Sequence, residues 1–333
     1  VTASVGVALV PRDGQNVLDL MRNSDMAMYS AKAAGRNATA VYVPSLSTAG
    51  LERLELETAL HKALERQELV LHYQPKVDVR GARMVGAEAL MRWQRGGRLV
   101  PPGEFIPLAE ESGLIVPMSQ WAITEAARQV KVWHERLGFS DAIAVNLPSR
   151  LFERPDLVDQ LRECTEASQV PLRSIQLEIT ETGLMKDLKS VIPALHRLND
   201  VGVRISIDDF GTGYSSLAYL TTLPISELKI DGSFVRDLGL TPQSAAVVTA
   251  IIALARALGL SVVAEGVENL RQMEVLHRQG CVVMQGYLFS RPLPPDDIER
   301  WLEQTVQPKK APWIGATGHA DHVEVKSPVA AKR

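Results

Sequence analysis

Short apolar runs that end in polar or charged residues recur along most of the chain. Seven of them read VGAEALMRW, IAVNLPS, IQLEITET, RISIDDFG, ELKIDGS, VVAEGVE and VVMQGYLF, and stretches with helical periodicity separate them. Strands that alternate with helices form a parallel sheet, and near-continuous apolar runs suit strands covered on both faces. The pattern therefore predicts an α/β fold in which a parallel barrel is surrounded by helices.

The carboxyl ends of these predicted strands carry a concentration of polar residues. In a parallel barrel the functional side chains gather at that rim, and here it would collect Glu88, Asn146, Glu178, Asp208, Asp209, Lys229, Glu265 and Gln285. Carboxylates and an asparagine carbonyl are hard oxygen donors suited to Mg²⁺ or Mn²⁺, and no histidine falls at a rim position. The number of carboxylates favours two ions that share a bridging aspartate, an arrangement suited to phosphoester cleavage.

Each rim residue has a simpler interpretation when taken alone. Asn146 is typical of a turn, Gln285 of a hydrogen-bonded core residue and Lys229 of an ion pair, and a single acid at a strand end is commonly a helix cap. The joint pattern favours a metal site, because independent caps would not place unpaired carboxylates on successive strands. The adjacent Asp208 and Asp209 would face opposite sides of a regular strand. We expect both to reach one site because the following FGTG sequence predicts that the strand ends there.

Composition excludes only a few classes of function. A chain of 333 residues with 46% hydrophobic content can bury one large core and a smaller element, and a net charge of −3 argues against a general nucleic-acid binder. The two cysteines, Cys164 and Cys281, form no CxxC pair and favour a reducing, cytoplasmic location. The apolar segment 245–264 contains Arg256 and is interrupted at Gly259, so it predicts a helix followed by a strand rather than a membrane span. The opening residues do not have the pattern of a signal peptide, and we expect none within them.

Residues 1–42 do not follow the barrel pattern. VTASVGVALV alternates like a strand, and residues 17–34 have helical character. SVGVA at 4–8 and DMAMYSAKAAGRN at 25–37 resemble the closing segment of a GGDEF (diguanylate cyclase) domain. That domain's signature loop and nucleotide site are not within these residues, so the resemblance implies no cyclase activity here.

The remaining boundaries follow from composition. We predict a linker at 43–54, a charged amphipathic helix at 51–67 that opens a barrel domain spanning 51–304, and a disordered tail at 305–333, which is rich in Pro, Gly, Ala and charge. Tyr73 and Trp93 are expected to be ordinary core aromatics.

Eight sequence blocks, in order and at the expected spacing, resemble the EAL-domain cyclic-di-GMP phosphodiesterases. They are YQPKVD at 73–78, AEALMRW at 87–93, VNLPS at 145–149, LEITET at 177–182, IDDFGTGYSSLAYL at 207–220, LKIDGSFV at 228–235, VVAEGVE at 262–268 and QGYLFSRP at 285–292. The resemblance implies a modified (β/α)₈ TIM-like barrel that hydrolyses cyclic di-GMP to linear pGpG. It also implies two Mg²⁺ or Mn²⁺ ions and a homodimer formed through the EAL domain. We expect Ca²⁺ to inhibit, because it accepts larger and looser coordination shells. The charge and the segment pattern predict neither nucleic acid nor, for these residues, a membrane as a partner.

The resemblance also implies a role for each matching position. The first metal ion would be held by Glu88, Asn146, Glu178 and Asp208, and the second by Asp208, Asp209 and Glu265, with Asp208 bridging. Besides Glu265, two other residues are expected to contribute to catalysis. Lys229 would orient or help deprotonate the attacking water, and Glu181 would anchor the DFGTGYSS loop that couples dimerisation to the site. The expected substrate contacts are Gln74, Arg92, Asp231 and Gln285, with Gln285 also holding metal-bound water.

Two other functions are compatible with such a barrel. One is a catalytically silent receptor that binds cyclic di-GMP and signals through the loop after Asp209 and the dimer interface; the intact set of predicted ligands argues against it. The other is a metal-dependent lyase on a similar barrel, since fold alone does not fix the chemistry. A lyase requires a base beside a carbon acid, and the IDDFGTGYSS block does not resemble one.

Overall fold

The computed structural model describes residues 2–33, 37–44, 53, 55–213, 217–238 and 242–305. The chain divides into two compact units. One comprises residues 1–69 and 93–114, and the other comprises residues 70–92 and 115–333. The predicted disordered tail lies, from residue 306 onward, outside the described residues, as does most of the predicted linker.

The first unit contains the segment that resembles a GGDEF domain. Strand β1 (Val5–Val7) pairs in parallel with β2 (Thr39–Val41), and α1 (Val17–Ala33) connects them. The same unit holds β5 (Arg98–Val100) and α3 (Pro102–Ser112). Trp93 is fully buried there, with its ring 5.9 Å from that of Phe105, so its predicted role as a core aromatic is confirmed.

The helix predicted at 51–67 is shorter than expected. Within the described residues it runs over 55–60, and turns follow up to Gln67. The backbone N–H groups of Lys62 and Ala63 bond to carbonyls three residues earlier rather than four, and Gln67 takes a positive φ of 55°. The tightened turns and the left-handed residue end the helix early, although the amphipathic pattern continues.

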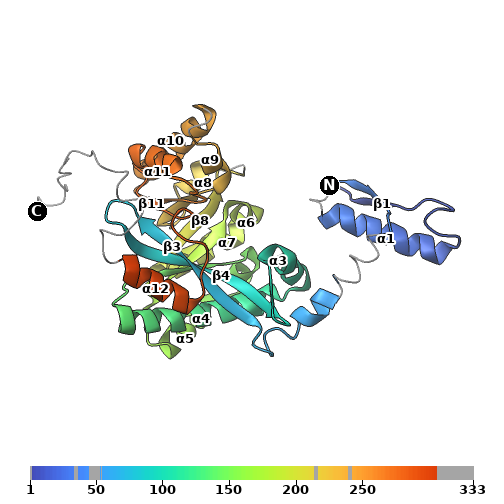
Figure 1. Ribbon diagram of the computed structural model, residues 1–333, viewed down its shortest axis with the longest axis horizontal. Helices are drawn as coiled ribbons and strands as arrows, with labels where there is room; N and C mark the ends of the chain where they lie inside the picture. The colour runs from blue at the N-terminus through green and yellow to red at the C-terminus, as the bar shows by residue number, and fades with distance from the viewer. Residues whose placement is uncertain are drawn as a thin grey trace, which may run out of the picture. The chain divides into compact units, whose positions relative to one another are not determined.

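The second unit holds nearly all of an eight-stranded barrel surrounded by helices (Figure 1). Leu69 and residues 93–95, at the ends of two of its strands, are counted with the first unit. Its strands, in hydrogen-bonded order, are β3 (Leu69–Asp78), β11 (Val283–Met284), β10 (Ser261–Ala264), β9 (Glu227–Ile230), β8 (Arg204–Phe210), β7 (Ile175–Thr180), β6 (Ile143–Asn146) and β4 (Arg83–Arg95). Pairing of β3 with β4 closes the barrel. The predicted fold class is thereby confirmed.

One strand departs from the parallel pattern. Strand β3 runs antiparallel to β11, whereas β4 and β6 through β11 run parallel to one another. Only the turn 79–82 separates β3 from β4. A connection this short permits an antiparallel hairpin and not a parallel crossover, which needs a dozen or more residues.

Helices connect the remaining strands. They are α4 (Ile115–Leu137), α5 (Leu157–Ala167), α6 (Glu181–Lys186), α7 (Leu188–Asp200), α8 (Leu217–Leu220), α9 (Gly232–Arg236), α10 (Pro242–Ala257), α11 (Leu270–Arg278) and α12 (Pro295–Thr305), with 3₁₀ turns at Ser149–Glu153 and Leu172–Ser174. The apolar segment 245–264 forms most of α10 and then β10, as predicted. Within the described ranges, no helix is both long and apolar enough to cross a membrane.

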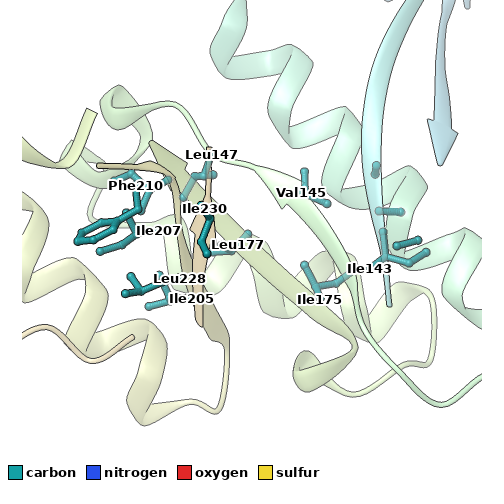
Figure 2. Close-up of a cluster of buried hydrophobic side chains, with 14 of the residues drawn as sticks. Ile143, Val145, Leu147, Ile175, Leu177, Ile205, Ile207, Phe210, Leu228 and Ile230 are labelled. Atoms are coloured by element: carbon teal, nitrogen blue, oxygen red, sulfur yellow. The ribbon is translucent and has the colours of Figure 1, made fainter. Parts of the chain in front are cut away.

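The hydrophobic core lies between the barrel and its helices. The outward-facing residues of β6, β7, β8 and β9 form a continuous buried cluster that includes Ile143, Val145, Ile175, Leu177, Ile205, Ile207, Leu228 and Ile230 (Figure 2). Each such side chain stabilises the fold by roughly 1.5–3 kcal/mol relative to an exposed one. Tyr73 is also fully buried, with its ring 4.8 Å from that of Trp133, which confirms the prediction for that residue.

Candidate active site

On β7, β8 and β9 the residues that alternate with this apolar set point into the barrel, and they are polar. On β7 the inward positions are Gln176 and Glu178, and on β9 they are Glu227 and Lys229. Side chains on a strand alternate between its two faces, so when the apolar residues face the helices, the residues between them face the barrel interior. The interior is thus lined by groups that can bind ions and hydrogen-bond.

Lys229 lies at the centre of the carboxylates near the rim. Its fully buried Nζ is 2.6 Å from Glu178 Oε2, 2.6 Å from Glu265 Oε1, 3.1 Å from Asp208 Oδ2 and 3.3 Å from Glu88 Oε2. Four predicted metal ligands, contributed by four strands or strand ends, therefore converge on one ammonium group. The structure brings together the residues that the sequence placed on a common rim.

A chain of amide side chains fixes Glu88. Asn146 Nδ2 donates to Glu88 Oε1 at 2.8 Å, and Gln285 Nε2 donates to Glu88 Oε2 at 2.7 Å. Gln285 Nε2 also donates to Gln74 Oε1 at 2.9 Å, and Gln74 in turn donates to the Ser290 carbonyl. Among the buried side-chain atoms described, Gln285 Oε1 has no hydrogen-bond partner within the protein. This acceptor is suited to a water molecule or a substrate N–H group.

Asp208 and Asp209 reach the same site by a route that differs from the prediction. Strand β8 continues to Phe210, but its register with β9 shifts between Ile207 and Phe210, so the two aspartates lie in a β-bulge. Asp209 adopts a left-handed conformation with φ of 54°, which aspartate tolerates better than most residues. A bulge redirects a side chain, and the strand need not end for both carboxylates to face the site.

The carboxylates form two groups that could each hold a cation. Oxygen atoms of Glu88, Glu178 and Asp208 lie within 4.8 Å of one another, and so do those of Asp208, Asp209 and Glu265. Asp208 belongs to both groups, which fits the predicted bridging role. The donors are all oxygen atoms, as Mg²⁺ and Mn²⁺ prefer.

The charge balance of this cluster also suits cations. Burial raises the pKa of Glu88 and of Glu265, and the neighbouring carboxylates add to the rise, although Lys229 opposes it. Burial, Asp208 and Asp231 together raise the pKa of Asp209 to about 6. Lys229 alone does not offset Glu88, Asp208, Asp209 and Glu265, and divalent cations would favour the ionised forms of these acids. The residues therefore fit the predicted pair of metal ions.

Glu178 differs from its neighbours. Burial would raise its pKa, but the lysines Lys229 and Lys76 lower it to about 2. The same carboxylates, Glu178 foremost, hold the pKa of Lys229 well above its ordinary value against the opposing effect of burial. Glu178 and Lys229 therefore each favour the charged form of the other.

A cavity of about 300 Å³ opens beside these groups. It is lined by Gln74, Glu88, Leu90, Asp208, Glu265, Gly266, Glu268, Gln285, Gly286 and Tyr287. Five predicted site residues therefore line the cavity, namely Gln74, Glu88, Asp208, Glu265 and Gln285. A cavity with a few convergent polar groups beside perturbed carboxylates is the expected location of an active site.

Glu181 lies outside the cavity lining but contacts the glycine-rich loop after β8. The side chain is fully buried at the first position of α6, and its Oε2 accepts a hydrogen bond of 2.6 Å from the Gly211 N–H. Gly213 approaches the same carboxylate so closely that a Cβ there would lie 2.7 Å from Oε1. These contacts are consistent with the predicted anchoring of the loop, of which residues 214–216 lie outside the described ranges.

Arg92 and Asp231 do not line the cavity, and their side chains bond to nearby backbone groups. Arg92 is partly buried and donates to the Met91 carbonyl at 2.9 Å, and it is not among the cavity-lining residues. Asp231 is the N-cap of α9, where Oδ1 accepts a hydrogen bond from the Ser233 N–H at 3.0 Å. Both remain predictions as substrate contacts.

Sequence reasoning did not identify three residues that the structure places at or below the site. Tyr287 lines the cavity and is half exposed, with the Arg291 guanidinium 4.2 Å from its ring centroid. Lys76 and Glu227 form a buried ion pair inside the barrel. The period-two alternation of polar residues in β3 could have placed Lys76 beside Gln74 on the inner face.

Comparison with known proteins agrees with this geometry. Residues 57–292 match the EAL domain family, and residues 1–38 match the family described as diguanylate cyclase, GGDEF domain. The bifunctional diguanylate cyclase/cyclic di-GMP phosphodiesterase MucR of Pseudomonas aeruginosa is 46% identical over 300 residues, which are 90% of this chain and 44% of the relative. The cyclic di-GMP phosphodiesterase PdeR of Escherichia coli is 40% identical over 304 residues, 91% of this chain and 46% of the relative.

The chain spans less than half the length of these curated relatives. A solved structure of the MucR phosphodiesterase in complex with c-di-GMP superposes with a TM-score of 0.70 and 46% identity, and covers 73% of this chain and 99% of that one. The EAL enzyme Bd1971 in its cGMP-bound form gives a TM-score of 0.73 at 32% identity, over 85% of this chain and 78% of the other. From the converging carboxylates, the barrel and these matches, we conclude that the chain belongs to the EAL domain family, preceded by a short segment of the GGDEF family.

Proposed function

We propose that this chain is a phosphodiesterase that hydrolyses cyclic di-GMP to linear pGpG with the help of two divalent metal ions. The observation that carries the proposal is the convergence of Glu88, Glu178, Asp208 and Glu265 around Lys229 beside an open cavity. Relatives that are 40–46% identical over this part of the chain are named as cyclic di-GMP phosphodiesterases, which supports the choice of substrate.

We propose the same two sets of metal ligands that the sequence predicts. Glu88, Asn146, Glu178 and Asp208 would hold one ion, and Asp208, Asp209 and Glu265 the other. When bound, such a pair supplies Lewis acidity and lowers the pKa of water. The rest of the chemistry falls to the side chains around it.

Lys229 and the glutamines would position the reactants. Lys229, whose carboxylate neighbours favour its protonated form, would orient the attacking water or help to deprotonate it, and would stabilise charge on the phosphoryl oxygens. Gln285, whose Oε1 is free to accept, would orient water, and Gln74, Arg92 and Asp231 would contact the nucleotide. Attack of water on one phosphorus releases the ribose 3′-oxygen, which leaves a terminal phosphate and a free hydroxyl on linear pGpG.

Incubation with cyclic di-GMP and Mg²⁺, followed by chromatography of the nucleotides, tests the proposal. We expect pGpG to accumulate and EDTA to abolish its formation. Calorimetric binding of cyclic di-GMP without turnover would instead support the silent receptor.

We also propose a homodimer formed through the EAL domain and a cytoplasmic location. Light scattering after size-exclusion chromatography tests whether the protein is a dimer.

Replacing Mg²⁺ by Ca²⁺ should abolish turnover even where Ca²⁺ binds. Ca²⁺ accepts larger and looser coordination shells, whereas a site built for Mg²⁺ or Mn²⁺ requires short, near-octahedral coordination. The measurement is initial rate in Mg²⁺ with increasing Ca²⁺, which we expect to fall as Ca²⁺ competes. Equal rates in the two metals would contradict the assignment of a paired Mg²⁺ or Mn²⁺ site.

A further inference from the structure

A second buried lysine lies below the rim. Lys76, on the antiparallel strand β3, is only 3% exposed, and its side chain points into the barrel. Its Nζ lies 2.9 Å from Glu178 Oε1 and 2.9 Å from Glu227 Oε1. Strands β7 and β9, which carry these two acids, are not neighbours of β3 in the sheet, so Lys76 reaches across the barrel interior.

Lys76 and Lys229 hold opposite oxygen atoms of one carboxylate. Lys76 binds Glu178 Oε1, and Lys229 binds Oε2 at 2.6 Å. Lys229 also contacts Glu88 and Asp208, so Oε2 is the oxygen that faces the other predicted ligands. The contact to Oε1 therefore determines how the carboxylate plane is turned toward the rim.

Lys76 is itself held from below. Glu227 Oε1 accepts hydrogen bonds from Lys76 Nζ and from Gln176 Nε2, the latter at 2.8 Å, and Ser261 Oγ donates to Glu227 Oε2 at 3.3 Å. Gln176 and Glu227 occupy the inward positions two residues before Glu178 and Lys229. They form a second polar layer, one pleat below the predicted metal ligands, in which charges alternate from Glu227 through Lys76 and Glu178 to Lys229.

We propose that Lys76 is a positioning residue for the metal site, which holds Glu178 Oε1 so that Oε2 is presented to the cation. The inference rests on the proposed metal-dependent function. Hydrogen-bond partners that orient a metal ligand typically contribute 10- to 100-fold to metal affinity or activity. The competing explanation is that Lys76 serves only as the structural partner of Glu227.

The test compares Lys76→Met, Glu227→Gln and the double variant by Mn²⁺ binding to the nucleotide-free protein, measured by electron paramagnetic resonance. We expect Lys76→Met to bind Mn²⁺ about 10- to 100-fold more weakly, and Glu227→Gln, which leaves Lys76 on Glu178, to bind it nearly normally. The double variant lacks both charges of the Lys76–Glu227 pair. If Lys76 serves only as the partner of Glu227, Mn²⁺ affinity should return to the wild-type value in this variant. If Lys76 positions Glu178, Mn²⁺ affinity should stay as low as in Lys76→Met.

The double variant also keeps the test decisive if Lys76→Met fails to fold, since removing both members of a buried pair is far better tolerated than removing one. Wild-type Mn²⁺ affinity in Lys76→Met, or its return in the double variant, would overturn the proposal. Excess Mn²⁺ should partly restore turnover by Lys76→Met with little change in KM for cyclic di-GMP. Mn²⁺ binding is measured without substrate, so failure of the phosphodiesterase proposal would appear separately, as wild-type protein that binds Mn²⁺ but hydrolyses nothing.

Discussion

Replacing Lys229 by methionine should lower turnover of cyclic di-GMP by about a thousandfold, the upper end of the loss seen when one charge-stabilising donor is removed. The lysine contacts four predicted ligands at 2.6–3.3 Å, so it is the cation at the centre of the proposed metal site. Methionine keeps the length and the apolar stem of the side chain while removing the charge and the hydrogen bonds.

The same substitution should destabilise the metal-free protein. Removing one partner of a buried ion pair typically costs about 3–5 kcal/mol, because the other charge is left uncompensated. We expect the melting temperature of Lys229→Met to fall by several degrees in EDTA and to recover in part with Mn²⁺, which would replace the missing positive charge. Turnover should not recover with the metal.

Lys189→Met provides the matched control, because Lys189 is an exposed lysine on α7. We expect it to leave both turnover and melting unchanged. Near-normal turnover by Lys229→Met would remove this residue from the proposed chemistry. Equal melting with and without Mn²⁺ would indicate that no cation compensates for the lost lysine.

Replacing Glu181 by alanine should reduce turnover by roughly 100-fold, because displacement of catalytic groups by about an ångström can have that effect. The buried carboxylate accepts the Gly211 N–H at 2.6 Å and contacts the loop again at Gly213. Without it, the loop loses the contact that fixes its start, and the neighbouring Asp208 and Asp209 are misplaced. Turnover, Mn²⁺ titration and thermal melting, measured on one preparation, distinguish a loss of activity from a loss of metal binding or of stability.

Glu181→Gln should retain most activity, because an amide oxygen can still accept from Gly211. Glu163→Ala, at an exposed position on α5, serves as the control for the loss of a carboxylate. Wild-type turnover by Glu181→Ala would refute the loop-coupling role. A broad loss of thermal stability in both Glu181 variants would make the residue structural.

Much of this fold could be predicted because the barrel imposes a simple periodicity. Ile175, Leu177 and Ile179 face the helices while Gln176 and Glu178 face inward, so strand identity and rim position are both visible in one short run. The convergence of acids followed from the shared direction of the strands. The short turn at 79–82 could also have been predicted from the sequence. A turn of this length joins antiparallel strands, so it would have predicted the direction of β3.

Other features depended on contacts that no local pattern reveals. The bulge at Asp208 and Asp209 arises from register against β9, which is a property of two strands together. The link from Lys76 to Glu178 joins residues 102 positions apart across the barrel. A long-range pair of this kind follows only from the complete strand order.

The most direct test of the account is hydrolysis of cyclic di-GMP with Mg²⁺ in water enriched in heavy oxygen, with the products analysed by mass spectrometry. We predict linear pGpG in which the label is carried by the terminal phosphate, and no product from Asp208→Asn, which weakens the ligand shared by both proposed ions. Unchanged cyclic di-GMP after prolonged incubation of folded, metal-loaded protein, or linear product without the label, would contradict the proposed mechanism of water attack.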